Sequence, residues 1–360
     1  MARNRFFGLT NRVLMLIAAA LLVVSYLSML VNPAKLWLMS LAGLLFVPFA
    51  FLNVFLLIWA FVRRSKAFVI PLLALIPAFF LLGRYARFVS EEEAAPVVTS
   101  DGSIKVMSWN VGRFALSHRT LDFEDYQECA DSVFDYIRKQ DADVICLQEV
   151  RVSDSRKIRQ YLAKKMPGYS AEYYIFPARS GSFGNVTLSR MPVRNRGVIR
   201  FDESANLAIF TDYKSGDRTF RVYNCHFESY NISFSGIVKG LLESDREVFT
   251  VTGEKMRRSI TRRPKQVNKV FDDIEDCPVE AFVCGDFNDN PTSYTYYRMM
   301  RDRQDTFVEA GNGFGATYSL MWPLLRIDYI LCPKSAQIIS HETPHVRLSD
   351  HYPVISELVL

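Results

Sequence analysis

The chain divides into two parts that differ in the pattern of apolar and polar residues. The first part holds three long apolar stretches, at about residues 13–31, 36–62 and 67–83. A helix of roughly 17 to 20 apolar residues is long enough to cross a bilayer. We therefore expect a membrane anchor over residues 1–87 that contains three transmembrane helices, the third being the shortest.

After a short polar linker at residues 88–101, apolar runs alternate with amphipathic segments. Apolar residues at helical spacing predict a helix over Asp122–Lys139, and a second helix is expected over Arg156–Lys165. Strand-like runs centre on seven residues: Tyr173, Val186, Ala208, Val222, Phe282, Ile330 and Val354. Strands in both halves with helices between them predict one α/β domain over residues 102–360, with two sheets packed face to face and helices outside.

The predicted domain contains a long insertion at about residues 229–274. It carries an apolar run followed by the basic segment "KMRRSITRRPKQ". One interpretation is a helical excursion with a solvated charged face. The other is a lid beside an active site, in which cations such as Arg262 and Arg263 bind an anionic headgroup or another polyanionic substrate. The sequence leaves both open.

Polar residues with catalytic chemistry stand where predicted strands end. The run "VCGDFNDNP" places Asp286 and Asn288 two residues apart after an apolar strand, so their side chains point the same way. A carboxylate can take a proton or bind a cation, and a carboxamide can donate to an oxyanion without adding negative charge. Gly285, just before them, allows the chain to turn.

Other strand ends carry similar groups. The runs "IKVMSWN" and "DVICLQE" end in Asn110 and Glu149, "RIDYILC" contains Asp328, and "LSDHYPV" sets Asp350 and His351 before the last strand. An unpartnered carboxylate in an apolar strand costs several kcal/mol. We therefore expect these acids to converge on a shared opening rather than to act as separate turn residues.

Seven motifs in one order resemble the endonuclease/exonuclease/phosphatase superfamily, which has a deoxyribonuclease-I-like fold. They are "SWNVGRF", "DVICLQEV", "GNVTLSRMPV", "YNCHFES", "GDFNDNP", "RIDYIL" and "LSDHYPV". The resemblance covers about residues 103–360. It implies a four-layer α-β-β-α sandwich and metal-dependent hydrolysis of phosphate esters, but it does not indicate the substrate.

The resemblance also implies a metal site. By similarity to the family, Glu149 is the principal metal ligand, and Asp350 and Asn110 lie in or beside its shell. Hard cations prefer oxygen ligands and keep several waters, so one or two carboxylates suffice to hold them. The expected cofactor is Mg²⁺, with Mn²⁺ or Ca²⁺ as alternatives.

The catalytic roles follow from the same resemblance. Asp286 would activate or orient water while Asn288 fixes the phosphate, and His351, oriented by Asp328, would contact the phosphate as it gains charge. His226 would donate to the phosphate or act as an acid on the leaving side. Asn185 is either a turn residue or a substrate contact. The sequence does not decide which residue is the general base.

Charge is distributed unevenly along the chain. Residues 1–83 contain seven Lys or Arg and no Asp or Glu, so the rest has 43 − 7 = 36 basic and 38 acidic residues, a net charge of −2. Nucleases usually present a basic surface to phosphate backbones, and this domain has no such excess of basic residues.

Six of the anchor's cations would share one side of the membrane: Arg3, Arg5, Arg12, Arg63, Arg64 and Lys66. The positive-inside rule then places the N-terminus in the cytoplasm and the catalytic domain outside it, at an inner membrane. If residues 67–83 do not cross, the domain is cytoplasmic.

The leading interpretation is a membrane-anchored phosphodiesterase or phosphatase. Its partners would be the bilayer and a phosphate ester, either a lipid headgroup, a small phosphodiester or a nucleic acid; no protein partner is inferred. The alternatives are a nuclease and a non-catalytic phosphate-binding membrane protein.

Overall fold

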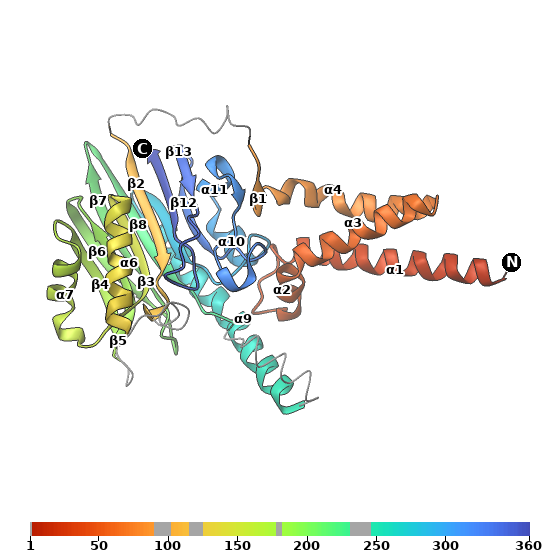
Figure 1. The fold of residues 1–360 in the computed structure, drawn as a ribbon, viewed down its shortest axis with the longest axis horizontal. Coiled ribbons are helices and arrows are strands. Elements are labelled where there is room, and N and C mark those ends of the chain that lie inside the picture. Colours follow the sequence, from red (N-terminus) through yellow and green to blue (C-terminus); the bar gives the residue numbers. More distant parts are fainter. Residues whose placement is uncertain (1, 90–101, 115–124, 178–181, 231–245) are drawn as a thin grey trace. The chain divides into compact units, whose positions relative to one another are not determined.

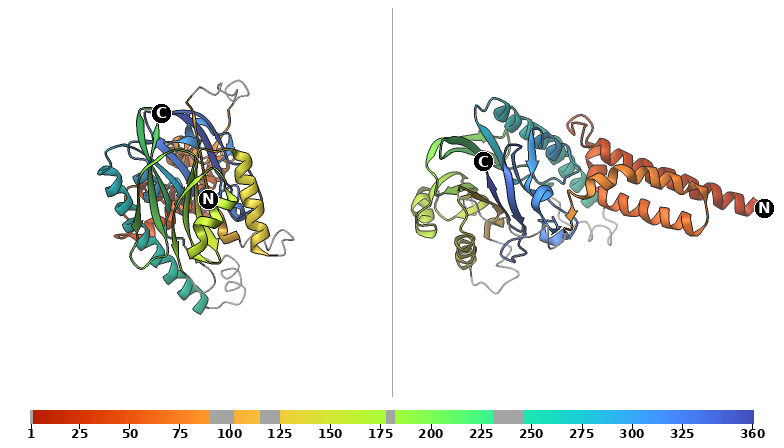
Figure 2. Two further views of the ribbon diagram at one scale, coloured as in Figure 1. Left: turned by 90° about the vertical axis from the view of Figure 1, so that its left-hand side faces the viewer. Right: turned by 90° about the horizontal axis from the view of Figure 1, so that it is seen from above.

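The structure is a computed structural model that describes residues 2–89, 102–114, 125–177, 182–230 and 246–360 (Figures 1 and 2). The chain forms two compact units. The sandwich unit comprises Ala86–Ser229, Lys265–Asn288 and Arg298–Leu360. The helical unit comprises Met1–Tyr85, Tyr230–Pro264 and Asp289–Tyr297, so it takes in the first part of the insertion and a short segment after Asn288.

The sandwich unit contains two six-stranded sheets. The first has the order β13-β14-β2-β3-β5-β4. Its strands are β2 (Ile104–Asn110), β3 (Val144–Val152), β4 (Ser170–Phe176), β5 (Ser182–Ser189), β13 (Gln337–Glu342) and β14 (Val354–Val359). Neighbours are antiparallel except β2 and β3, which run parallel because a helix connects them.

The second sheet has the order β10-β12-β9-β8-β7-β6. Its strands are β6 (Val193–Arg200), β7 (Leu207–Ser215), β8 (Arg218–His226), β9 (Glu280–Asp286), β10 (Arg303–Asp305) and β12 (Asp328–Pro333). Again one pair, β8 and β9, is parallel. Buried residues of both sheets, such as Val106, Val144, Val222 and Phe282, form the core between them.

Helices cover the outer faces of both sheets (Figure 2). Trp109 and Phe134 belong to the core beneath α6 (Tyr126–Gln140) and α7 (Ile158–Lys165), on the first sheet. The second sheet is covered by the C-terminal half of α9 (Arg246–Glu275), where Asp273 accepts a hydrogen bond from the Tyr223 hydroxyl. The predicted four-layer α-β-β-α sandwich is therefore confirmed.

Short elements complete the unit. They are β1 (Ala86–Arg87), which pairs with β11 (Gly313–Phe314), the helix α11 (Thr306–Ala310), and the single turns η2 (Gly112–Phe114), η3 (Ser155–Lys157) and η4 (Ser319–Met321). The helix α10 (Tyr294–Met299) begins in the helical unit, which includes residues up to Tyr297. The two helices predicted from periodicity are α6 and α7. Each starts a few residues later than expected, because Asp125 caps α6 and a 3-10 turn precedes α7.

The helical unit contains α1 (Ala2–Leu27), α2 (Trp37–Leu44), α3 (Phe46–Val62), η1 (Lys66–Phe68) and α4 (Val69–Leu82). These helices pack through small and aromatic side chains, among them Phe46, Ala50 and Ala78. Asn53 is buried in this bundle, where its amide donates to the carbonyls of Ala18 and Phe49. The burial of this side chain among apolar residues is thus matched by hydrogen bonds from its amide N–H groups.

Of the three predicted spans, only α1 is by itself long and apolar enough to cross a membrane, over Leu9–Leu27. The second stretch forms α2 and α3, which meet at a bend of 59° and pass the same test only as a pair. The third forms a shorter apolar helix, Lys66–Leu82. The bend follows from the unwound residue Leu45, and the third helix covers nearly all of the predicted stretch, with Gly83 as its C-cap.

Two sequence expectations fall largely outside the described residues. The polar linker is described only at its first two residues, Phe88 and Val89. The apolar run "FSGIVKGLL" of the insertion lies within 231–245, which the structure does not describe. The basic segment that follows lies on α9, whose residues up to Pro264 belong to the helical unit.

Candidate active site

Three neighbouring strands of the second sheet bring polar side chains into line. In the strand register, His226 at the end of β8 pairs with Asp286 at the end of β9, and Asp286 pairs with Asp328 at the start of β12. β12 is antiparallel to β9, so its first residue lies at the same sheet end as the last residues of β8 and β9. Asp286 and Asp328, two of the acids expected to converge, therefore lie side by side at this sheet end, next to His226.

The turn after β9 depends on local backbone geometry. Gly285 has φ = +132°, and a Cβ atom there would lie 1.9 Å from the carbonyl oxygen of Cys225. Only glycine fits such a close approach. Asn288 adopts φ = 51°, a left-handed conformation that Asn tolerates, and its backbone N–H donates to Asp286 at 2.8 Å. Backbone constraints thus place Asp286 and Asn288 side by side.

Asp286 is the central buried carboxylate of the site. Its oxygens accept hydrogen bonds from the side chains of Asn110 (2.9 Å) and Asn288 (3.1 Å), as well as from the Asn288 backbone. Burial, together with the negative charge of Asp328, raises the pKa of Asp286 to about 6, although His351 and His226 act to lower it. A carboxylate with a pKa near neutrality is suited to take up a proton.

His351 and Asp328 form a buried pair. The Nδ1 atom of His351 lies 2.9 Å from Oδ2 of Asp328, and its Nε2 atom lies 3.9 Å from Oδ2 of Asp286. Burial acts to lower the pKa of His351, but the charges of Asp328 and Asp286 outweigh it and raise this pKa well above its usual value. The imidazole therefore carries a proton on Nδ1, and its orientation is fixed by Asp328.

Glu149 lies at the edge of the same group. It stands where a bulge interrupts the pairing of β3 and β5, with φ = 55°. Its carboxylate lies 3.6 Å from Nε2 of His226 and accepts a hydrogen bond from Arg113 at 2.8 Å. Burial acts to raise the pKa of Glu149, but His226 and Arg113 together lower it below the ordinary value. Glu149 is thus an ionised carboxylate at a kinked, partly open position.

Asn110 and Asp350 approach each other around Gly112. The backbone N–H of Gly112 donates to Oδ1 of Asn110, and a Cβ atom on Gly112 would lie 2.7 Å from Oδ1 of Asp350. Ser349 connects the two segments, because its hydroxyl donates to the Asn110 carbonyl and also lies 3.2 Å from Asp350. Together with Glu149, these residues offer carboxylate and amide oxygens, the ligand type that Mg²⁺ and Mn²⁺ prefer.

Asp286, Asp328 and His351 form a second candidate metal cluster, since one ligand atom from each lies within 4.8 Å of the others. Their donor atoms are already engaged, however. Asp328 binds Nδ1 of His351, and Asp286 accepts three N–H groups from Asn110 and Asn288. The oxygens of Glu149, Asp350 and Asn110 are the alternative set, in which Oδ1 of Asn110 accepts from Gly112 and Glu149 pairs with Arg113.

The predicted substrate-binding residues lie in three different settings. Asn185 on β5 is buried, and its amide donates to the carbonyls of Leu207 and Asn224. Arg262 on α9 is half-buried. Arg263 is 2 % exposed and forms an ion pair with Asp289 at 3.0 Å within the helical unit.

Three further residues of the site were not singled out by sequence reasoning. Arg113 binds Glu149, and its guanidinium stacks on Phe183 at 3.9 Å. Tyr318 packs edge-on against the ring of His351, and Trp109 donates its indole N–H to the His351 carbonyl. Arg113 and Trp109 lie inside the motif "SWNVGRF", but only the tertiary structure brings them to these partners.

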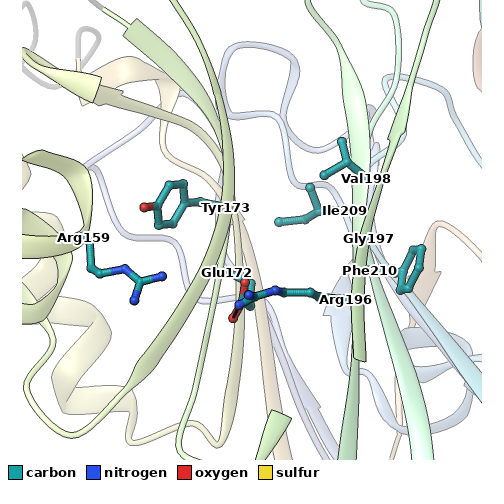
Figure 3. A pocket seen from close by; sticks show the side chains of 8 residues that line it. All are labelled: Arg159, Glu172, Tyr173, Arg196, Gly197, Val198, Ile209 and Phe210. Carbon is teal, nitrogen blue, oxygen red and sulfur yellow. Dashed lines mark hydrogen bonds and ion pairs between the residues drawn. The ribbon is translucent and has the colours of Figure 1, made fainter. Parts of the chain in front are cut away.

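A pocket of about 400 Å³ lies elsewhere in the sandwich unit, between the edge strands β4 and β6 (Figure 3). An ion pair between Arg196 and Glu172 bridges the two strands there. Its lining contains none of the predicted site residues: it consists of Arg159, Glu172, Tyr173, Arg196, Gly197, Val198, Ile209 and Phe210. The catalytic candidates and this pocket are therefore separate features.

Comparison with protein families gives two matches. The sequence profile of the Endonuclease/Exonuclease/phosphatase family matches residues 107–351. A domain of unknown function matches residues 4–85, which correspond to the N-terminal part of the helical unit. No curated protein sequence matches the chain.

Solved structures with the same fold include the endonuclease/exonuclease/phosphatase from Beutenbergia cavernae, at 19% identity over 72% of each chain with a TM-score of 0.53. The corresponding protein from Bacteroides vulgatus has 18% identity and a TM-score of 0.54, covering 72% of this chain and 100% of that one. The human Nocturnin catalytic domain with a bound sulfate anion has 16% identity and a TM-score of 0.51, covering 71% and 93%.

Proposed function

Because the chain belongs to the Endonuclease/Exonuclease/phosphatase family, we propose that it is a membrane-anchored, divalent-metal-dependent phosphodiesterase or phosphatase. Proteins of this family typically hydrolyse phosphoester bonds. The observation that carries the proposal is the alignment of His226, Asp286 and Asp328 on three adjacent strands, with His351 bound to Asp328. A domain that only binds a ligand would have no need for a buried carboxylate with a raised pKa beside an oriented imidazole.

Glu149, Asp350 and Asn110 would hold the metal ion. When bound, a divalent cation neutralises the non-bridging phosphate oxygens and stabilises the leaving oxygen. Glu149 suits this role because it remains ionised, and Asp350 and Asn110 supply further oxygens around Gly112. Arg113 would balance the charge of Glu149 in the absence of the ion.

The remaining residues would act on the water and the phosphate. Asp286 accepts the proton of the attacking water or orients it, while the amides of Asn110 and Asn288 hold its carboxylate in place. The protonated His351 donates from Nε2 to a phosphate oxygen, because Asp328 occupies Nδ1. His226, between Glu149 and Asp286, would donate on the side of the leaving group.

The substrate class is best tested with the full-length protein in detergent and Mg²⁺ or Mn²⁺. The panel should contain bis-p-nitrophenyl phosphate, sphingomyelin, inositol phosphates, DNA and RNA. Hydrolysis of a small or lipid phosphate ester would support the proposal, and cleavage of nucleic acid alone would indicate the nuclease. Metal binding without turnover of any substrate would indicate the non-catalytic alternative.

The basic face of α9 is a proposed substrate contact. Arg262 is half-buried and lies near the exposed residues Arg257 and Arg258. We propose that this face attracts anionic headgroups, whereas Arg263 acts through its ion pair with Asp289. Salt should then weaken hydrolysis of lipid substrates more than that of a small soluble diester, since exposed charges are screened beyond about 10 Å at 0.1 M salt.

The pH dependence of kcat/KM should be bell-shaped. Activity should fall as the pH drops through about 6, because Asp286 then takes up a proton and cannot act as a base. It should fall again on the alkaline side, where His351 loses the proton that its carboxylate neighbours stabilise. The measurement is a pH–rate profile with the small diester at fixed metal concentration.

Removing the charge of Asp328 provides the internal control for this profile. Asp328→Asn should move the alkaline limb to lower pH, because Asp328 is the largest of the charges that raise the pKa of His351. An alkaline limb that stays in place would contradict the assignment of that limb to His351.

Exposed apolar side chains on the helical unit support membrane anchoring. Phe51, Val62, Phe79 and Phe80 are each more than 60% exposed: 67%, 73%, 75% and 76%. A soluble protein rarely exposes so many large apolar side chains on one helical bundle. We propose an integral protein of the inner membrane, in which α1, the α2–α3 pair and α4 cross and the sandwich unit lies outside the cytoplasm.

Cysteine accessibility in intact spheroplasts tests this topology. All six native cysteines are free thiols; five are buried and Cys277 is half-buried, so Cys277→Ser should leave little labelling of native cysteines. An added cysteine at Asp217→Cys, in the exposed turn between β7 and β8, should react with an impermeant maleimide before lysis. Arg63→Cys, after α3, should react only after lysis; protection of both would place the sandwich unit in the cytoplasm.

A further inference from the structure

The segment that directly follows the catalytic motif is enclosed within the helical unit. Asn288 donates to Asp286 and is joined by its peptide bond to Asp289, the first residue of this segment. Residues 289–297 belong to the same compact unit as α1–α4. Among them, Asn290 and Thr292 are almost fully buried. A catalytic loop in the sandwich unit thus continues into a stretch whose surroundings are N-terminal helices.

Thr292 is the centre of these contacts. Its hydroxyl donates to the Gly43 carbonyl of α2 at 2.9 Å and lies 2.7 Å from the Tyr85 hydroxyl, which therefore acts as the donor to it. Its carbonyl accepts from the Ser28 hydroxyl at 3.0 Å. The amide of Asn290 donates to the same Gly43 carbonyl at 2.9 Å. We call Ser28, Gly43, Tyr85, Asn290 and Thr292 the latch.

The latch is closely packed as well as hydrogen-bonded. A Cβ atom on Gly43 would lie 2.3 Å from the Ser28 hydroxyl and 2.7 Å from the Thr292 carbonyl. Neither separation is compatible with a real side chain, so only glycine allows α2 to approach the segment this closely. Arg84 adds a hydrogen bond to the Pro291 carbonyl at 3.3 Å.

The first residue of the segment is fixed independently. The carboxylate of Asp289 accepts hydrogen bonds from the hydroxyls of Tyr230 and Thr295 and forms the ion pair with Arg263. It is 6% exposed. Its buried charge is therefore compensated, and the backbone leaving Asn288 is held at Asp289 as well as at Thr292.

We propose that the N-terminal helices position the catalytic loop through the latch, in addition to anchoring the protein. This inference rests on the proposed hydrolase function of Asp286 and Asn288. Catalytic groups act efficiently only when held within fractions of an ångström of the productive geometry, so a held loop favours turnover. Thr292, Tyr85 and Gly43 are positioning residues, because they act on the reacting groups only through Asn288 and Asp286.

The test compares full-length variants in lipid nanodiscs with bis-p-nitrophenyl phosphate and Mg²⁺. Thr292→Val removes the hydroxyl at constant shape, and Tyr85→Phe removes its donor. Each should lower kcat by about three- to tenfold, the rate equivalent of one buried hydrogen bond, with KM unchanged. Thr292→Ser keeps the hydroxyl and should stay close to wild type.

Tyr26→Phe is the matched control. Tyr26 also donates its hydroxyl to a carbonyl in the helical unit, that of Ala74 at 2.7 Å, and its ring packs on Phe46 rather than on residues 289–297. Its loss should leave kcat unchanged. Hydrogen exchange of the backbone amides of residues 286–293 should accelerate in Thr292→Val and Tyr85→Phe, and not in Tyr26→Phe.

The outcomes separate the two hypotheses. An active wild type whose latch variants keep full kcat and unchanged exchange would overturn the latch. Equal losses in Tyr26→Phe would show a general effect of destabilised helices and would also overturn it. A wild type inactive on every phosphate ester would instead refute the proposed function, and the exchange measurement would still decide whether the latch holds the loop.

Discussion

Replacing Glu149 with Gln should lower kcat/KM by about a thousandfold or more. Gln keeps the shape of the side chain but removes the charge that would hold the cation, and loss of one metal-centred stabilisation corresponds to several kcal/mol in the transition state. The fold should persist, because Glu149 lies at a bulge and is partly solvated rather than part of the apolar core.

Metal binding provides a readout separate from activity. Mg²⁺ or Mn²⁺ should raise the melting temperature of the wild-type protein and have little effect on Glu149→Gln. Glu172→Gln is the matched control, since it makes the same carboxylate-to-amide change at an ion pair with Arg196 on the edge of the sandwich. Turnover and metal-induced stabilisation in Glu149→Gln equal to those of this control would contradict the metal assignment.

Replacing Asp328 with Asn should lower kcat by about 10²- to 10⁴-fold with little change in KM, a range typical of losing the carboxylate that orients a catalytic imidazole. Nδ1 of His351 would no longer face a fixed acceptor, so the ring could adopt the wrong tautomer or rotate. The fold should tolerate the change, because Asn has nearly the same shape as Asp and removes a negative charge from a fully buried position. The described residues provide no donor for the Oδ1 atom of Asp328, so no hydrogen bond to that atom is lost.

A second aspartate separates this effect from a general one. Asp143 precedes β3 and also accepts hydrogen bonds, from the Lys105 N–H and from Arg190, but it has no contact with the catalytic residues. Asp143→Asn should change stability slightly and leave kcat near the wild-type value. A rise in KM in Asp328→Asn without a fall in kcat would mean that His351 binds the substrate ground state rather than the transition state.

The parts of the fold that were predictable are those in which local pattern and tertiary environment agree. The buried strands near Phe282 and Ile330 read as apolar runs, and α6 shows its buried face through Val133, Phe134 and Ile137. The strand β6 was not expected, because its segment "VRNRGVIR" is largely polar and exposed at a sheet edge. Edge strands carry a weaker apolar signal, since one of their sides has no neighbour.

The same distinction holds for the site. Asp286 and Asp328 could be identified from sequence, because burying a carboxylate in an apolar strand costs free energy unless a partner compensates its charge. The setting of Arg263 could not, since its partner Asp289 is remote in sequence and belongs to a motif whose other residues point to catalysis. The buried pair of Arg326 and Asp305, with contacts of 2.8 and 2.6 Å, could not be predicted for the same reason. Pairing across long sequence separations leaves no local pattern.

The hydrogen bonds between Thr292 and the N-terminal helices affect how inhibitors should be sought. Deleting residues 1–85 is the obvious route to a soluble reagent, but it removes the Gly43 carbonyl and the Tyr85 hydroxyl that bind Thr292. Under the latch proposal, compounds selected against such a shortened protein would be optimised for a catalytic loop that lacks these hydrogen bonds. Screening should therefore use the whole chain, or a shortened chain whose residues 290–292 have been redesigned to hold the loop unaided.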